Sequence, residues 1–356
     1  MLVISNLMSL RSFLLREFFL LLFAAGTVAL SLWRGEAPKI SPDEWRVLAL
    51  LFTLLVAVKG FELSGVLEFL ALRLEDFKPF PTLLVLYTAV LSMFVTNDAA
   101  LLTVVPVTLL LKRNRGLIPL LVVLEILAAN IGSALSPFGN PQNIYLVHHY
   151  GLTLRDFLSA VVPLFLPLLV FLSVLAPRGM GKAESPKGGF VLNLRPLLVS
   201  PVAFLLFLGV FFKILPLWVL VAVPLVGLLY WKTLKVDYNL LLTFLVFFAF
   251  SSLIKVELLS PSPFGVFMGS VLLSQVVSNV PVAVILAKLT PLWKPLLLGS
   301  NVGGFGTPVA SLANLIGIRL YLKSGLDRGI FWFLFWSLNL LFLVMGICLF
   351  ALLEGF

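Results

Sequence analysis

Apolar runs of about 20 residues recur along this chain and are separated by short polar turns, which is the length that a helix needs to cross a bilayer core of roughly 30 Å. Of the 356 residues, 61% are hydrophobic and only 12% are charged. Soluble domains carry about 25% charged residues. So few charges cannot cover a water-facing surface of this size, which excludes a soluble enzyme, a disordered chain and a nucleic-acid-binding protein. The sequence therefore predicts an all-α polytopic membrane protein.

Two apolar stretches, 80–111 and 263–290, differ from the others because each carries a polar cluster at its middle, Thr96-Asn97-Asp98 and Ser278-Asn279. Each is long enough for two half-depth helices and a tip, so we expect two re-entrant hairpins. We expect about nine full spans in addition. The candidate spans are 13–33, 46–61, 117–147, 158–176, 197–213, 217–231, 238–254, 295–319 and 330–353.

The net charge of +9 is explained by the distribution of basic residues. If the N-terminus is cytoplasmic, 17 of the 25 Lys and Arg residues fall on the inner side, as the positive-inside rule requires. We therefore expect a multi-pass protein of the cell (inner) membrane, with the N-terminus cytoplasmic and the C-terminus outside. We expect these basic residues to anchor the spans in the lipid bilayer, which is the expected partner of the protein. We expect no nucleic-acid partner.

A motif of 14 residues occurs twice, at 130–143 and 301–314. Both copies begin and end with Asn, carry Gly at the third place, and have Ser or Thr followed by Pro at the seventh and eighth places. Each copy follows one of the hairpins. Because Gly and Pro disfavour continuous helix, we expect two broken helices, within 117–147 and 295–319.

Counting the membrane crossings predicts that the second repeat is inverted relative to the first. We expect a first repeat at 1–176, a cytoplasmic linker with a connecting span at 177–216, and a second repeat at 217–356. Inverted repeats with interrupted helices are typical of secondary transporters, whose binding sites lie near the membrane midplane. The alternative is that these Gly and Pro residues mark ordinary kinks, which are common in membrane helices.

Broken helices in a membrane can bind ions because their free backbone groups need partners. Carbonyl groups with Asn and Ser or Thr oxygens suit Na⁺, while helix N-termini suit an anion. Asp98 is the only acid that we expect at midplane depth, so it is a candidate proton carrier or cation ligand. The alternative is that Asp98 caps the second half of the hairpin. His148 and His149 are expected to anchor an outer edge, and the single cysteine, Cys348, excludes an internal disulfide.

The hairpin tips and the two motifs resemble the ion transporter superfamily of arsenite permeases, sodium/proton antiporters and divalent anion/sodium symporters. The specific resemblance covers about 92–146 and 270–320. It implies a substrate-and-ion site formed by tips and breaks, an elevator-like motion and a homodimer. The implied substrate residues are Thr96, Asn97, Asp98, Asn143, Ser278, Asn279, Thr307 and Asn314. The implied Na⁺ candidates are Thr96, Asn97, Gly132, Ser136, Asn140, Ser278, Asn279, Gly303 and Thr307.

Three functions are compatible with these features. The leading hypothesis is a secondary active transporter of a small anion or oxyanion, arsenite-like or a carboxylate, coupled to Na⁺ or H⁺. The alternatives are a Na⁺/H⁺ antiporter, favoured by Asp98, and an ion channel, which the repeat disfavours. An enzyme is not expected, because no nucleophile or metal-binding group appears at depth, and no cofactor is expected beyond a coupling Na⁺.

Overall fold

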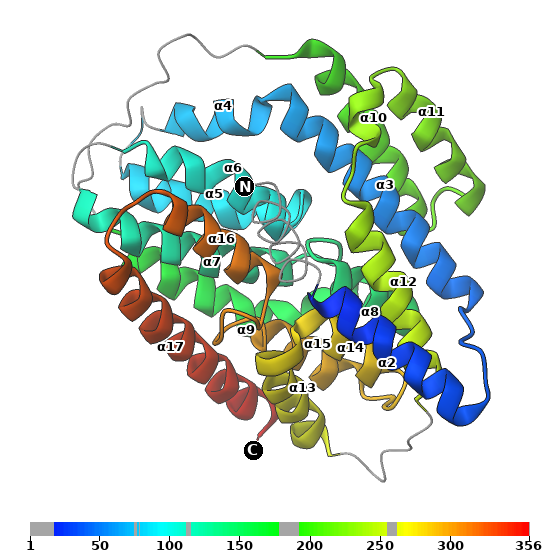
Figure 1. Cartoon of the computed structure of the whole chain (residues 1–356). Helices are drawn as coiled ribbons and strands as arrows, with labels where there is room; N and C mark the ends of the chain where they lie inside the picture. The colour runs from blue at the N-terminus through cyan, green and yellow to red at the C-terminus, as the bar shows by residue number, and fades with distance from the viewer. Residues whose placement is uncertain are drawn as a thin grey trace, which may run out of the picture.

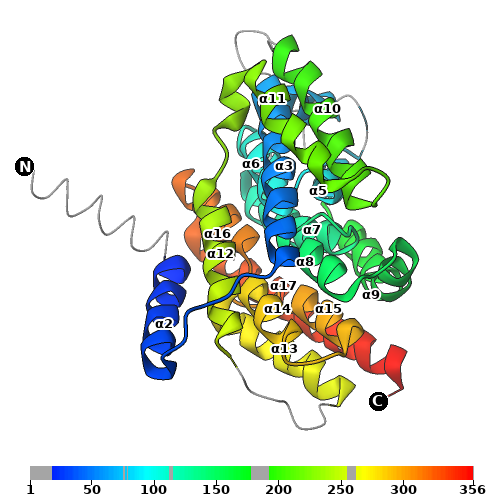
Figure 2. The same ribbon diagram turned by 90° about the vertical axis from the view of Figure 1, so that its right-hand side faces the viewer.

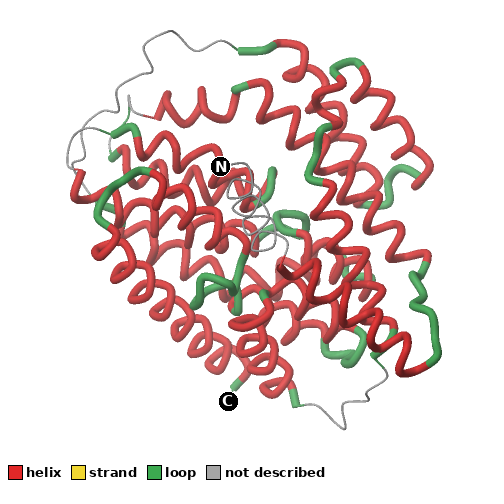
Figure 3. The backbone as a smooth tube through the Cα atoms, viewed as in Figure 1, coloured by secondary structure: helices red, strands yellow, loops and turns green. Residues whose placement is uncertain are grey.

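The protein is a bundle of helices in the computed structural model, which describes residues 18–74, 77, 79–111, 115–177, 192–254 and 262–355 (Figure 1, Figure 3). Within these ranges no strand is formed, and six helices are long and apolar enough to cross a bilayer. The predicted all-α polytopic membrane fold is confirmed. The count of nine full spans stays a prediction, because five further apolar helices are only 10–17 residues long.

One group of helices forms a layer on one side of the molecule (Figure 2). Its central pair is α3 (Pro42–Ser64) and α10 (Leu194–Phe211), which contact each other along their length. Gly60 makes this contact close, since a Cβ atom there would meet the Ser200 side chain. The other members are α2 (Phe18–Arg34), α11 (Ala222–Leu228) and α12 (Tyr238–Ser252). We call this group the scaffold layer.

A second group of helices begins with a hairpin, and its order is repeated later in the chain. The first series begins after the short helix α4 (Val66–Arg73), and the 3-10 turn η2 (Arg115–Leu117) lies between its second and third helices. Its members are α5 (Phe80–Phe94), α6 (Asn97–Leu109), α7 (Ile118–Ala134), α8 (Pro141–Tyr150) and α9 (Leu154–Leu175).

The second series has the same order of a hairpin, two helices separated by a break, and one long helix. Its members are α13 (Pro263–Val277), α14 (Asn279–Ala287), α15 (Trp293–Val302), α16 (Leu312–Lys323) and α17 (Arg328–Glu354). The two series contact each other crosswise, because α6 packs against α16 and α14 packs against α8. In Figure 1 the first hairpin enters from the left and the second from the lower part of the view, and both are directed toward the middle. We call these two series together the core bundle.

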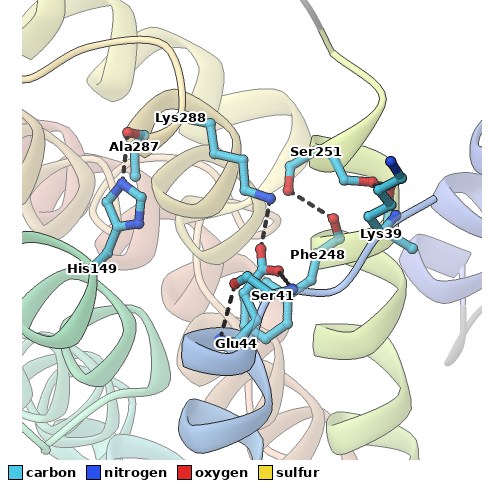
Figure 4. A network of polar contacts seen from close by, with 10 residues as sticks. Lys39, Ser41, Glu44, His149, Phe248, Ser251, Ala287 and Lys288 are labelled. Carbon is cyan, nitrogen blue, oxygen red and sulfur yellow. Dashed lines mark hydrogen bonds and ion pairs between the residues drawn. The ribbon is translucent and has the colours of Figure 1, made fainter.

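The junction between the scaffold layer and the core bundle includes an ion pair at the start of α3 (Figure 4). Ser41 and Glu44 form a capping box, and Pro42 occupies the first turn, so the sequence begins a helix here. The buried Glu44 carboxylate also forms an ion pair with Lys288, with 2.6 Å between Oε1 and Nζ. Since Lys288 follows α14, this contact joins the scaffold layer to the second hairpin.

One predicted span is shorter in the structure than in the sequence analysis. The segment 217–231 was expected to be a full span, but it consists of the 3-10 turn η3 (Leu217–Val221) and α11, followed by the 3-10 turn η4 (Trp231–Leu234). The continuous helical stretch Leu217–Leu228 rises only about 18 Å at 1.5 Å per residue. Pro224 removes one backbone donor from the stretch, which helps to explain why regular helix is short here. Most of the predicted linker at 177–196 lies outside the described residues.

The packing of α7 on α5 depends on Gly132, which gives a test of the bundle. A Cβ atom at this position would overlap the Ala89 carbonyl oxygen and the Ser92 hydroxyl. We expect Gly132→Ala to lower the free energy of unfolding by about 2 kcal/mol or more, because backbone cannot move aside as a flexible side chain can. Thermal denaturation of the purified protein in detergent measures this effect.

Gly269 is the matched control, because it lies inside α13 with open space around its missing Cβ atom. We expect Gly269→Ala to leave stability unchanged or to raise it by up to about 1 kcal/mol, as helix propensity favours alanine. Equal melting temperatures for Gly132→Ala and the wild type would contradict the close packing described here.

Candidate functional site

Two helix breaks lie in the interior of the core bundle, as the duplicated motif predicts (Figure 3). The first separates α7, which ends at Ala134, from α8, which begins at Pro141. The second separates α15, which ends at Val302, from α16, which begins at Leu312. Gly306 adopts a positive φ of 101°, a conformation that favours glycine, in the second break. The expectation of two broken helices is confirmed.

Asparagine side chains connect the two breaks across the middle of the bundle. Asn130 Nδ2 donates to Asn314 Oδ1 at 2.9 Å, and Asn301 Nδ2 donates to Asn143 Oδ1 at 2.8 Å. Asn130 and Asn301 hold equivalent places in the duplicated motif, as do Asn143 and Asn314. The first residue of each motif therefore binds the last residue of the other, and we call these four residues the asparagine cross-link.

The last residue of each motif also closes its own break. Asn143 and Asn314 each use both amide hydrogens on carbonyl oxygens of their own break or of the last turn of the helix before it, and both are fully buried. This satisfies backbone groups that have no helical partner. The four acceptors are Ser133 O and Ser136 O for Asn143, and Gly304 O and Thr307 O for Asn314, at 2.9–3.2 Å.

The residues that begin the second half-helices complete the pattern. Asn140 is the N-cap of α8 and Ser311 is the N-cap of α16. Asn140 Nδ2 donates to Asn301 Oδ1 at 3.0 Å, and Ser311 Oγ donates to Asn130 Oδ1 at 2.9 Å. Each cap is thus bound to the other half of the bundle.

The two hairpin tips have the same backbone shape but different chemistry. Thr96 and Ser278 have positive φ values of 100° and 73°, which turn the chain sharply between the two helices of each hairpin. The second tip is tied to the second break, since Asn279 N donates to Ala310 O at 3.0 Å. A Cβ atom on Gly304 would lie 3.0 Å from Asn279 Nδ2, so this amide also rests against the break.

The first tip carries the acid and its own cap. Thr96 Oγ1 accepts from Ala99 N at 3.4 Å, and Asn97 Oδ1 accepts from Asp98 N at 3.0 Å. The capping role considered for Asp98 is therefore filled by Thr96. Asp98 Oδ1 is buried with no hydrogen-bond partner. An acid in this position is available for a proton or a cation.

The other predicted site residues have packing or positioning contacts. Gly132 and Gly303 bring α7 and α15 close to their hairpins, at Ser92 and Ser274 respectively. Thr307 is held by Gln275, because its N–H donates to Gln275 Oε1 and its hydroxyl to Gln275 O, both at 2.9 Å.

Gln275 was missed in the sequence analysis, although it is central to the second break. Its Nε2 donates to Gly303 O and Phe305 O at 3.0 and 3.1 Å. It lies three residues before the tip of the second hairpin, where only an amide inside an otherwise apolar helix signals it.

Glu125, a second buried acid, was also missed, while the expectation that Asp98 is the only acid at midplane depth stays a prediction. Glu125 lies in α7 and is fully buried. Its Oε1 accepts a hydrogen bond from the Thr108 hydroxyl, and its Oε2 has no partner. A single acid in the apolar run 118–129 was the sequence signal. Within the described residues, no group of acids, histidines and cysteine is arranged to hold a metal ion.

The asparagine cross-link can be tested by removing one member. We expect Asn301→Ala to lower the free energy of unfolding by about 2–4 kcal/mol, since each buried partner left unpaired costs roughly 1–3 kcal/mol. Asn143 Oδ1 loses its donor and Asn140 Nδ2 loses an acceptor. The measurement is thermal denaturation in detergent.

Asn339 serves as the matched control. It is fully buried in α17, but its amide donates only to Phe335 O of its own helix. Asn339→Ala should therefore cost less than Asn301→Ala. A smaller loss at Asn301 than at Asn339 would mean that the cross-link does not stabilise the breaks.

Comparison with known proteins agrees with this architecture. A protein-family model described as citrate transporter (CitMHS) matches residues 7–292. The chain is 35% identical over 346 residues to the inner membrane protein YbiR of Escherichia coli, which covers 89% of this chain and 90% of that protein. It is 32% identical over 298 residues to an uncharacterised transporter of Methanocaldococcus jannaschii, covering 78% and 81% of the two chains.

A shorter match reaches an uncharacterised transporter of Mycobacterium tuberculosis, with 34% identity over 160 residues, 42% of this chain and 37% of that protein. The family and these relatives are transporters or membrane proteins, and none is described as an enzyme. The expectations of a transporter and of a multi-pass membrane protein are thereby confirmed. With the matched family model covering most of its length, the chain belongs to the citrate transporter family.

Proposed function

We propose that this protein is a secondary active transporter that moves a small anion or oxyanion across the membrane, coupled to Na⁺ or H⁺. The observation that carries the proposal is the asparagine cross-link, which holds the two helix breaks together inside the bundle, with the second hairpin tip bound to the second break by Asn279 N. Half-helices that meet in a membrane interior offer backbone groups to a substrate and an ion.

The second tip is the better candidate for the anion. The helix α14 begins at this tip and has no side-chain cap, whereas α6 is capped by Thr96. An uncapped helix N-terminus carries a positive partial charge. The Asn279 N–H already donates to Ala310 O and Pro281 has no N–H, so the Val280 N–H and the side chains of Ser278 and Asn279 would be the donors here. Ser278 and Asn279 lie beside it and are almost buried. A carboxylate or an oxyanion fits these donors.

The first tip is the better candidate for the coupling cation. Asp98 supplies a negative charge there, with an unpartnered oxygen. Thr96, Asn97, Ser136 and Asn140 supply oxygen atoms at this tip and in the first break, the ligand type that suits Na⁺. The substrate roles first assigned to Asn143 and Asn314 are less favoured, because both amides are used within the breaks.

Elevator-like alternating access is the motion that we infer. The core bundle holds both tips and both breaks, and it meets the scaffold layer mainly where α3 contacts α8 and α12 contacts α14. Such a division allows the bundle to slide against the scaffold as a unit. A homodimer formed through the scaffold layer, an inner-membrane location and the predicted inversion of the second repeat belong to the same proposal.

The predicted topology is supported by contacts between segments assigned to the outer side. Lys288 pairs with Glu44, and Lys294 pairs with Glu354, each at 2.6 Å. The start of α3, the base of the second hairpin and the end of the chain would then lie outside, with the N-terminus in the cytoplasm.

Uptake into proteoliposomes tests the proposal. We expect labelled citrate, succinate or arsenite to accumulate when an inward Na⁺ or proton gradient is imposed, and to exchange with unlabelled substrate without a gradient. A flux that neither saturates nor shows exchange would favour a channel instead. No flux for any anion would leave the proposal without support.

A Na⁺/H⁺ antiporter is the second candidate, because Asp98 places an unpartnered acid at the first tip. We expect Asp98→Asn to abolish Na⁺-dependent proton movement in vesicles loaded with a pH-sensitive dye, since the amide cannot carry the charge that binds the ion. Asp43→Asn is the control, because the Asp43 side chain is 75% exposed at the surface. Unchanged proton movement in the Asp98 variant would remove this candidate.

A further inference from the structure

We propose that Glu125 is a proton-binding site that couples substrate movement to the pH gradient. The inference deepens the proposed function and rests on it. It assigns a role to a buried acid that lies away from the tips and breaks, on the middle of α7.

The surroundings of Glu125 favour an acid that holds its proton. The side chain is fully buried, Oε1 accepts from the Thr108 hydroxyl, and Oε2 has no partner. The helix α7 is enclosed by α5, α6, α9, α16 and α17, so Glu125 faces protein and not lipid. A carboxylate with one hydrogen bond in such a place is costly, whereas a neutral carboxylic acid is tolerated.

No charge in the described part of the chain compensates an ionised Glu125. The helices packed against α7 carry several titratable groups, but none of them forms an ion pair or a hydrogen bond with Glu125. These groups are Tyr87, Asp98, Arg115, Arg155, Asp156, Lys294, Arg319, Tyr321, Lys323, Arg328, Cys348 and Glu354.

The second half of the bundle shows that the fold does not require an acid here. The duplicated motifs are offset by 171 residues, and the same offset from Glu125 leads to Leu296 in α15. Leu296 is also fully buried. An apolar side chain therefore serves the packing at the equivalent position, so the acid at 125 is not explained by packing alone.

The coupling follows from linkage between protonation and conformation. In a transport state in which the helices around α7 separate enough for water to reach Oε2, the carboxylic acid releases its proton to that water and a carboxylate remains. Return to the dry environment requires a proton from hydronium on the side then accessible. Because linkage is reciprocal, a conformational change that moves substrate also changes the affinity of Glu125 for its proton.

Sodium is the less suitable occupant of this site. Among the described residues, the Thr108 hydroxyl is the one side-chain group that hydrogen-bonds to the Glu125 carboxyl, and it donates its hydrogen. A hard cation prefers a larger set of oxygen ligands.

The test compares Glu125→Gln with the wild type in proteoliposomes, with labelled citrate as the probe. Glutamine can still accept from Thr108 but cannot release a proton. We expect Glu125→Gln to lose accumulation driven by a pH gradient and to keep citrate counterflow, which needs no coupling. The matched control is Glu62→Gln, an acid paired with Lys59 at 2.8 Å near the end of α3, which should keep both activities.

A second measurement is independent of transport and of the substrate. Infrared difference spectra of the purified protein should contain a protonated carboxyl band that disappears in Glu125→Gln. If Glu125→Gln lost both activities, Glu125→Asp would be expected to restore pH-driven accumulation, since it keeps a carboxyl group.

Three results would overturn the proposal. They are full pH-driven accumulation by Glu125→Gln, a wild-type spectrum without the band, and wild-type uptake that follows only the Na⁺ gradient. The last leaves the transporter intact and removes only the proton site. Absence of citrate flux in the wild type would count against the proposed function and not against the proton site. In that event the infrared band alone tests whether Glu125 holds a proton.

Discussion

The structure depends on one requirement, that every backbone group freed by a helix break inside the membrane finds a partner. Side-chain amides meet much of it here, because an amide offers two donors and an acceptor at one position without carrying a charge. Asn143 and Asn314 bind the carbonyl groups of their own turns, while Asn130 and Asn301 bind the opposite half. Charged residues would satisfy the same groups at a much higher cost of burial.

The same amides explain why the two halves of the core bundle form one unit. Each break is completed by residues from the other series, and each hairpin packs on the second half-helix of the other break. The close packing that glycine permits at Gly132 and Gly303 keeps the hairpins against their breaks. In the proposed elevator-like motion, a bundle built in this way would move as a body against the scaffold layer and keep its turns away from lipid.

Much of this arrangement was predictable from the sequence. The duplicated motif gave the positions of both breaks, and the polar clusters at Asn97 and Asn279 gave both tips, because Gly, Pro and Asn are rare together in apolar helices. Hydropathy alone overestimated the segment 217–231, where Pro224 and a short 3-10 turn leave little regular helix. Gln275 and Glu125 were missed because each is a single polar residue in an apolar run, and only the packing shows what it faces.

The crossed arrangement of the asparagines also bears on how the chain is made. The N-terminal half is synthesised and inserted first, and its Asn130 and Asn143 then stand in the bilayer without the residues that later bind them. Those partners arrive only when residues 301 and 314 have entered the membrane. Completion of the interior therefore depends on about the last sixth of the chain. A ribosome that stops before it leaves an incomplete protein with polar groups that lipid cannot satisfy.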